Sequence, residues 1–257
     1  VVLPSATQES RGWAKAYAQS VTLGTGQFCT NPGLILGIAG PAWDHFVATL
    51  SREVRQAPAG CMLHRGMAEN FRQLRTEFLS QEGVEEVDAI QGTGAEALVT
   101  GSVARVSGED FCANRALQQE VFGPFTLTVA CSDMEELLGA VRTLEGQLTA
   151  SLLGEPEEIG AEPGLVEVLK DKVGRLLFNG VPTGVEVCPA MHHGGPYPAT
   201  TDARFTSVGT DAVLRWLRPL SFQNAPGELL PPALRNENPL GIFRMVNGEF
   251  TRKSLEK

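Results

Sequence analysis

The hydrophobic and polar positions along the chain alternate between a helical period and short apolar runs. Apolar residues recur at helical spacing from Trp13 to Val21, so the pattern predicts a helix that Ser10 caps and Gly24 ends. The apolar run 34–39 predicts a buried strand, and residues 43–55 predict an amphipathic helix directly after it. The first part of the chain therefore has the order helix, turn, strand, helix.

The same alternation continues along the chain. Helical spacing recurs at residues 66–80 and 133–144, and apolar runs of strand length occur at 97–106, 125–131, 148–153 and 175–178. Helices that alternate with strands are typical of an α/β layer. We therefore expect an α/β fold with a largely parallel sheet flanked by helices.

The periodic pattern ends after Phe178. Residues 179–201 are rich in glycine, proline and histidine, and a long irregular loop inside a compact protein is typical of a functional segment. Beyond a boundary that we place near Gly195, the pattern predicts a short helix at 211–217 and an extended segment at 218–223.

Composition and charge narrow the class of protein. The 257 residues are enough for one large domain with a tail, and no apolar run reaches the roughly 18 residues that cross a membrane. We therefore expect a soluble protein without a membrane partner. The net charge of -9 disfavours nucleic acid as a partner. The chain begins Val1-Val2-Leu3-Pro4 without an initiator methionine, and we interpret it as a fragment.

Cysteine usage indicates a compartment and one candidate nucleophile. The five cysteines form no CxxC pair, which favours a reducing cytoplasm over a disulfide framework or a zinc ribbon. Cys29 lies in the small-residue turn 24–33, where a thiol can be partly exposed and reactive. Core packing remains the alternative for Cys29, since cysteine is commonly buried, and it is our prediction for Cys131 and Cys188.

The pair His192-His193 offers either metal ligands or a base. A catalytic zinc usually needs three protein ligands, and this loop offers at most two, so we expect no metal site. A dyad of Cys29 and His193 that hydrolyses its substrate stays open as an alternative at this point.

Residues 120–125 place a carboxylate and two aromatic rings around a Gly-Pro turn. Glu120 can accept hydrogen bonds from a ribose diol while Phe122 packs on a flat ring, although a plain turn with a core phenylalanine is the simpler interpretation. The segment Gly24-Thr25-Gly26 is not a dinucleotide-binding motif, because it follows a helix and no acidic residue stands at the required distance after it.

Three motifs in order resemble the aldehyde dehydrogenase superfamily. They are Gly26-Gln27-Phe28-Cys29, Glu120-Val121-Phe122-Gly123-Pro124 and Phe178-Asn179-Gly180-Val181-Pro182-Thr183-Gly184. The strings at 193–200 and 204–209 narrow the resemblance to the 2-oxoglutarate semialdehyde (2,5-dioxopentanoate) dehydrogenases and the related NADP-dependent fatty aldehyde dehydrogenases. The resemblance covers essentially the whole chain, as the C-terminal half of such an enzyme, and implies the aldehyde dehydrogenase catalytic-domain fold.

The resemblance implies roles for single residues. Cys29 matches the nucleophile, which forms a thiohemiacetal and then a thioester, and its backbone amide matches one half of the oxyanion hole. Glu120 and Phe122 match the residues that hold the nicotinamide ribose of NADP or NAD. The remaining matches are Phe28, Thr30 and the stretch Pro182 to Val185 in the aldehyde tunnel, and Asn179 as a brace of the catalytic loop. His192 and His193 then become structural, which disfavours the hydrolase.

The resemblance also implies what lies outside this sequence. The general base of the family stands in a Glu-Leu-Gly motif upstream of the nucleophile, and no such motif precedes Cys29. The cofactor-binding domain and the side-chain donor of the oxyanion hole belong to the same missing N-terminal half. We therefore expect the chain alone to be inactive, with residues 1–195 as the catalytic domain.

Residues 196–257 then hold an oligomerisation strand and a tail. The segment 216–223 resembles the strand that pairs across a dimer interface in this superfamily, so we expect a homodimer or homotetramer. The resemblance implies oxidation of 2-oxoglutarate semialdehyde to 2-oxoglutarate. A broad-specificity or fatty aldehyde dehydrogenase is the alternative within the class, and an isolated, non-catalytic assembly module is the alternative outside it.

Overall fold

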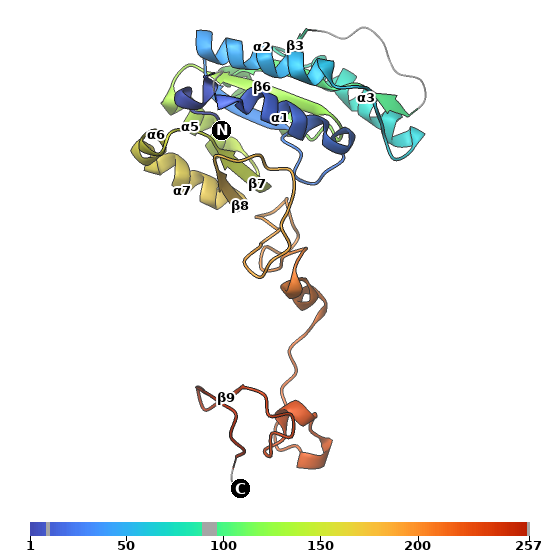
Figure 1. Ribbon diagram of the computed structural model, residues 1–257, viewed down its shortest axis with the longest axis vertical. Coiled ribbons are helices and arrows are strands. Elements are labelled where there is room, and N and C mark those ends of the chain that lie inside the picture. Colours follow the sequence, from blue (N-terminus) through green and yellow to red (C-terminus); the bar gives the residue numbers. More distant parts are fainter. Residues whose placement is uncertain (9–10, 89–96, 256–257) are drawn as a thin grey trace. The chain divides into compact units, whose positions relative to one another are not determined.

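A four-stranded sheet lies at the centre of the computed structural model, which describes residues 1–8, 11–88 and 97–255. Its order is β1 (Leu34–Ile38), β6 (Phe125–Cys131), β5 (Ser102–Ser107) and β3 (Glu85–Val87). The first three strands are parallel and β3 is antiparallel at the edge (Figure 1). The sheet is thus largely parallel, as the alternation of helices and strands predicts.

A second, parallel pair of strands continues this layer. It consists of β7 (Gln147–Leu152) and β8 (Val173–Phe178). Val2 forms isolated bridges to Gly37 of β1 and to Leu153 just after β7. The backbone N–H of Val2 donates to the carbonyl of Leu36 at 2.8 Å, so the first residues of the chain join the two sheets.

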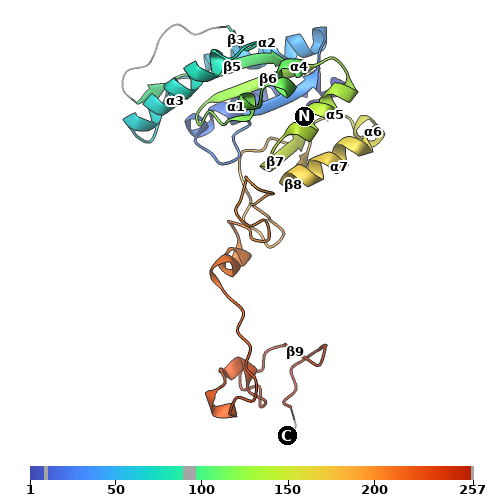
Figure 2. The ribbon, with the colours of Figure 1, turned by 180° about the vertical axis from the view of Figure 1, so that it is seen from behind.

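Helices cover both faces of the sheet. The helices are α1 (Trp13–Thr22), α2 (Pro41–Gln56), α3 (Arg65–Leu79), α4 (Gly108–Ala113), α5 (Met134–Thr143), α6 (Pro156–Ala161) and α7 (Pro163–Lys172). Helix α1 lies in front of β6 in Figure 1 and behind it in Figure 2. The short elements are η1 (Pro4–Thr7), η3 (Leu23–Gly26), η4 (Arg115–Gln118) and the antiparallel pair β2 (Gly60–Cys61) and β4 (Leu98–Val99).

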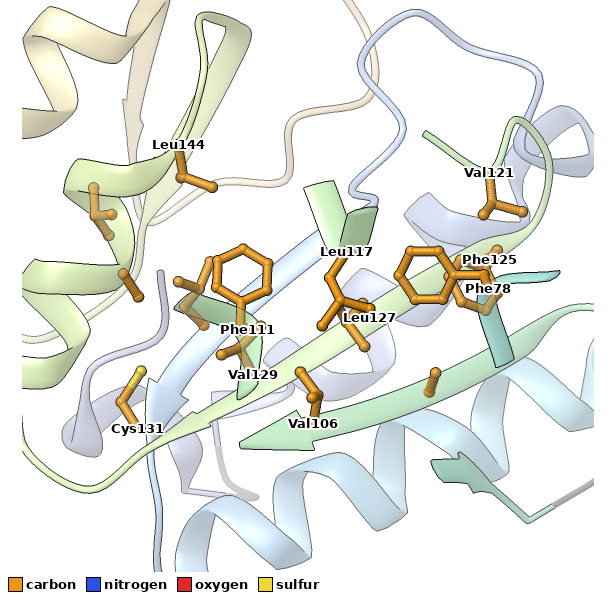
Figure 3. Close-up of a cluster of buried hydrophobic side chains, with 14 of the residues drawn as sticks. Phe78, Val106, Phe111, Leu117, Val121, Phe125, Leu127, Val129, Cys131 and Leu144 are labelled. Carbon is orange, nitrogen blue, oxygen red and sulfur yellow. The ribbon is translucent and has the colours of Figure 1, made fainter. Parts of the chain in front are cut away.

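Two hydrophobic clusters occupy the opposite faces of the sheet. Successive strand residues point to opposite faces, and accordingly Ile35 belongs to the cluster under α1 and α2 while Leu36 belongs to the other. The larger cluster gathers side chains from β5, β6, α3, α4 and α5 (Figure 3). Within it the rings of Phe78 and Phe125 meet edge to face, with their centroids 5.1 Å apart.

Most predicted elements are confirmed, and the differences concern one divided strand, one helix start and three further helices. The predicted single strand 97–106 is wrong: it divides into β4 and β5 at Gly101, where a Cβ would lie 2.5 Å from the side chain of Val54. Helix α1 begins after Gly12, and Ser10, the expected cap, lies outside the described residues. Helices α4, α6 and α7 were not predicted. The last two each begin at a proline, which suits the first helical turn.

The chain divides into two compact units between Arg215 and Trp216, after the boundary that the sequence places near Gly195. The predicted short helix is the 3-10 helix η5 (Thr210–Trp216). The second unit holds η6 (Gly227–Leu229), η7 (Pro232–Leu234) and an antiparallel hairpin of β9 (Arg244–Val246) and β10 (Glu249–Thr251).

The second unit has no hydrophobic core within residues 216–255. Asn238 is the buried residue there, and its Nδ2 donates to the carbonyls of Ile242 at 3.0 Å and Arg252 at 2.8 Å. Residues 217–222 belong to no helix or strand of this single chain, and Trp216 is 82% exposed.

Across the described ranges, no helix is both long enough and apolar enough to cross a membrane.

Candidate active site

A cavity of about 620 Å³ lies in the first unit, next to β1, β7 and β8. Its wall brings together residues that are far apart in the sequence and that the motifs single out: Cys29, Thr30, Glu120, Phe122 and Pro182. Phe28, Asn179 and Val185, which the resemblance also implies, are not part of this wall. The wall also contains residues that sequence reasoning missed, among them Tyr17, Asn31 and Ser151.

Cys29 is presented by a tight turn before β1. The backbone N–H of Asn31 donates to the carbonyl of Phe28 at 3.1 Å, so Cys29 and Thr30 occupy the two central positions of the turn. Thr30 is buried, whereas Cys29 is exposed and its thiol is open to a molecule in the cavity. The core-packing alternative for Cys29 is therefore wrong.

The other cysteines differ from Cys29 in their surroundings. All five lie in the described part of the chain and are free. Cys131 is buried at the end of β6, as predicted, and burial raises the pKa of its thiol to about 12. The prediction of core packing is wrong for Cys188, which is only half-buried in the irregular loop and belongs to neither hydrophobic cluster.

The turn of Cys29 is fastened to the turn that follows Glu120. The side-chain Nδ2 of Asn31 donates to the carbonyl of Gly123 at 3.1 Å. Glu120 lies at the cavity wall, where partial removal of its carboxyl from water raises its pKa although the residue as a whole is exposed. Beside it, Phe122 contributes a half-buried ring. A carboxylate next to an aromatic ring suits a ligand with a diol and a flat ring.

Asn179 braces the loop that follows β8. It adopts a left-handed backbone conformation with φ 48°. Its side chain accepts a hydrogen bond from the N–H of Gly154 at 3.0 Å and donates to the carbonyl of Gly154 at 2.9 Å. These two bonds tie the end of β8 to the end of β7, so Asn179 acts beside the cavity and not in its wall.

Helix α1 holds the same loop from the other side. Tyr17 and Ser20 are three residues apart and therefore share one helix face. The hydroxyl of Tyr17 donates to the carbonyl of Gly180 at 3.2 Å, and the hydroxyl of Ser20 donates to Oγ1 of Thr183 at 2.6 Å. Thr183 in turn donates to the carbonyl of Thr30 at 3.3 Å. The loop is thereby connected to the residue next to Cys29.

His193 is buried away from the cavity wall. Its backbone N–H donates to Oγ1 of Thr206 at 2.9 Å, and burial, followed by the positive charges of Arg175 and His192, lowers its pKa. This arrangement does not support the dyad of Cys29 and His193. Among the residues described, no group of three or more His, Cys, Asp or Glu side chains is placed to hold a metal ion.

Comparison with known proteins finds relatives that match nearly the whole chain. It is 44% identical over 251 residues to alpha-ketoglutaric semialdehyde dehydrogenase 2 of Azospirillum brasilense. The alignment covers 97% of this chain and 48% of that protein. It is 41% identical over 258 residues to alpha-ketoglutaric semialdehyde dehydrogenase of Acinetobacter baylyi, with 98% and 48% covered. The chain thus spans about half the length of the curated relatives it matches. No family model matches it.

Solved structures show the same fold. Methylmalonate-semialdehyde dehydrogenase (DddC) from Oceanimonas doudoroffii superposes with a TM-score of 0.64 at 17% identity, over 82% of this chain and 44% of that one. Glyceraldehyde-3-phosphate dehydrogenase GapN from Methanocaldococcus jannaschii, complexed with NADP, gives 0.60 at 17% identity, over 76% and 41%. These superpositions confirm the expected fold, and the two curated relatives confirm the resemblance to semialdehyde dehydrogenases.

Proposed function

Because this chain is a homologue of the alpha-ketoglutaric semialdehyde dehydrogenases, we propose that it carries the catalytic cysteine of an NAD(P)-dependent aldehyde dehydrogenase. The observation that carries the proposal is the exposed thiol of Cys29 in a cavity wall that also holds Glu120 and Phe122. In this proposal residues 1–195 act as the catalytic domain, in the cytoplasm.

Cys29 is the proposed nucleophile. Its thiolate adds to the carbonyl carbon of the aldehyde, a carbon–sulfur bond forms, and the carbonyl oxygen becomes an alkoxide in a thiohemiacetal. The backbone N–H of Cys29 is one proposed donor to that oxygen, and a donor of this kind typically lowers a barrier by about 3 kcal/mol. After the thiohemiacetal is oxidised, a thioester remains on Cys29 and water releases the acid.

The proposed cofactor is a nicotinamide dinucleotide, and two residues of the cavity wall support this proposal. The Glu120 carboxylate can accept hydrogen bonds from the ribose diol, and the ring of Phe122 can pack against the riboside. When bound, NADP or NAD supplies the acceptor for the hydride that the thiohemiacetal loses. We propose that the cofactor is held mainly by the half of the relatives that this sequence does not span, together with the general base that activates water.

The proposed substrate is 2-oxoglutarate semialdehyde, which is oxidised to 2-oxoglutarate. The proposal follows the printed names of both curated relatives. In this proposal Thr30 and Pro182, which line the cavity, belong to the aldehyde tunnel, together with Phe28 and Val185 outside the cavity wall. A broad-specificity or fatty aldehyde dehydrogenase is the alternative, and activities measured with different aldehydes distinguish it from the proposal.

The proposed assembly is a homodimer or homotetramer formed through residues 216–223. Residues 217–222 of this segment belong to no helix or strand, and Leu217 and Leu220 are exposed, so the segment is available for strand pairing with a second copy. Such pairing buries the leucine side chains that are exposed in the second unit of the single chain.

The test uses a longer chain that includes the remaining half of the relatives, with formation of reduced nicotinamide as the readout. Cys29→Ser is expected to lower kcat by at least about 10³-fold with 2-oxoglutarate semialdehyde. Cys61→Ser is the matched control, because Cys61 is also exposed but lies outside the cavity wall, and it is expected to keep full activity. Full activity of the Cys29→Ser enzyme overturns the proposal. A strong preference for long-chain aldehydes favours the fatty aldehyde alternative.

A further inference from the structure

Thr183 lies in the loop after β8 and uses its hydroxyl twice. It accepts a hydrogen bond from the hydroxyl of Ser20 at 2.6 Å and donates one to the carbonyl of Thr30 at 3.3 Å. Ser20 and Thr30 are both buried. The Thr183 hydroxyl therefore bridges helix α1 and the turn that presents Cys29, between two buried partners.

Arg175 of β8 holds the loop on both sides of Thr183. Its Nη1 donates to the carbonyl of Gly184 at 3.0 Å, and its Nη2 donates to the carbonyl of Pro182. The backbone is thus fixed directly before and directly after Thr183, which limits the positions that its hydroxyl can reach. The bond from this hydroxyl to Thr30 is therefore supported from both sides.

The bond to Thr30 continues through two peptide groups of the Cys29 turn. The carbonyl of Thr30 and the N–H of Asn31 belong to one planar peptide group, and that N–H donates to the carbonyl of Phe28 at 3.1 Å. The carbonyl of Phe28 in turn shares a planar group with the N–H of Cys29. A bond that holds the Thr30 carbonyl therefore orients the N–H of Cys29 through two rigid groups.

We propose that Thr183 is a positioning residue for the oxyanion donor: through the Thr30 carbonyl it fixes the direction of the Cys29 N–H. A donor that is held in place before the reaction stabilises the developing negative charge without reorganising. Hydrogen bonds in a chain also polarise one another, which makes the last donor stronger. The inference rests on the proposed function, because it assigns Thr183 to the Cys29 reaction.

The test compares two reactions of Cys29 in this chain, each followed by mass spectrometry of the Cys29 peptide. The ester p-nitrophenyl acetate acylates the thiolate: a carbon–sulfur bond forms at the ester carbonyl, whose oxygen carries negative charge until p-nitrophenolate leaves. Iodoacetamide alkylates the same thiolate with loss of iodide, and no oxyanion forms. An oxyanion donor therefore accelerates the acylation and not the alkylation.

Thr183→Val removes the hydroxyl and keeps the branched shape of the side chain. It is expected to leave alkylation of Cys29 unchanged and to slow acylation by roughly 10-fold, less than the factor of at least about 10² that loss of a whole donor costs. Thr183→Ser keeps the hydroxyl and is expected to restore most of the acylation rate. Thr200→Val is the matched control, because the Thr200 hydroxyl also donates to a backbone carbonyl, that of Gly195 at 2.7 Å, but lies outside this chain of bonds. Both rates are expected to stay unchanged in the control.

A purely structural role makes a different prediction. In that case Thr183→Val lowers the melting temperature but does not slow acylation more than alkylation, and this result overturns the inference. If Thr183→Val does not fold, Ser20→Ala tests the same chain of bonds, because it removes the donor to Thr183. It is expected to slow acylation more than alkylation, by a smaller factor, and the absence of this difference overturns the inference as well. Because neither reaction needs a cofactor, failure of the proposed aldehyde oxidation is recognised separately, from the Cys29→Ser enzyme.

Discussion

Gly26 and Gly123 meet backbone to backbone, and a Cβ on Gly26 would lie 2.2 Å from the carbonyl carbon and oxygen of Gly123. Gly26 also has φ 66°, a conformation that side chains disfavour. This contact joins the turn of Cys29 to the turn after Phe122, so it determines how the proposed nucleophile faces the proposed cofactor-binding residues.

Gly26→Ala is expected to destabilise the protein by about 3 kcal/mol, because the methyl group overlaps a backbone that cannot give way and the residue is forced to keep a positive φ. Urea denaturation measures the loss. The control is Gly139→Ala, at a helical position of α5 where a Cβ meets nothing within 4 Å. That variant is expected to gain up to about 1 kcal/mol. Equal stabilities of the two variants contradict the close approach of the Gly26 and Gly123 backbones.

Asn179 allows its two contributions to be separated. Asn179→Gly keeps the left-handed conformation but removes both hydrogen bonds to Gly154, which is expected to cost about 2 kcal/mol. Asn179→Ala loses the same bonds and adds the strain of a positive φ, for a further loss of about 1 kcal/mol. Thermal or urea unfolding of the two variants checks the order. A higher stability of Asn179→Ala than of Asn179→Gly contradicts the left-handed backbone conformation of residue 179.

Stability is expected to fall at alkaline pH. Burial raises the pKa of Cys131 to about 12, with smaller contributions from Glu136, Cys112 and Asp133, and burial raises the pKa of Tyr17 to about 12. Above the unfolded pKa values of about 8.5 for cysteine and about 10 for tyrosine, the unfolded chain loses protons that the folded chain keeps. The contribution of these two groups to the free energy of unfolding is therefore fully present below pH of about 8.5 and is lost as the pH rises toward about 12.

The measurement is urea denaturation at several pH values between about 8 and 11, for the native sequence and for Cys131→Ala. Without the thiol, the folded and unfolded states no longer differ in protons bound at residue 131. The free energy of unfolding of the variant is therefore expected to decrease less steeply with pH, even though the variant is less stable at neutral pH. Parallel pH curves for the two proteins count against a buried, neutral Cys131 thiol.

Residues 216–223 are expected to mediate self-association. Leu220 is 63% exposed in the single chain, and a charge at this position opposes burial in a strand-paired interface. Leu220→Glu is expected to shift the protein toward monomer in size-exclusion chromatography with light scattering. Leu229→Glu, an equally apolar and exposed position outside the segment, is the control. If both variants are monomers, or both are oligomers, residues 216–223 are not the specific interface of self-association.

Several features of the fold could be predicted from the sequence, for a local reason. Strands β1 and β6 and helices α2, α3 and α5 have strong apolar periods, and each element is favoured by its own side chains before any packing takes place. The divided strand at Gly101 could not be predicted in this way, because the break depends on the close approach of Val54 from another element.

The candidate site follows the same division. The sequence by itself determined that Cys29 stands in a short turn before a buried strand and that Glu120 and Phe122 flank a Gly-Pro turn, because turn residues and apolar runs act over a few neighbouring positions. It also determined the family resemblance through motifs that are local strings.

Only the tertiary structure decided which of these strings meet. The parallel pairing of β1 with β6 places Cys29 and Glu120, which each precede one of these strands, at one cavity with Pro182. His193 lies outside its wall, and Arg175, a charge in an apolar run, donates to the loop beside the nucleophile. Contacts between residues this far apart depend on how whole elements pack and on which backbones can approach closely, and no local pattern along the chain records that information.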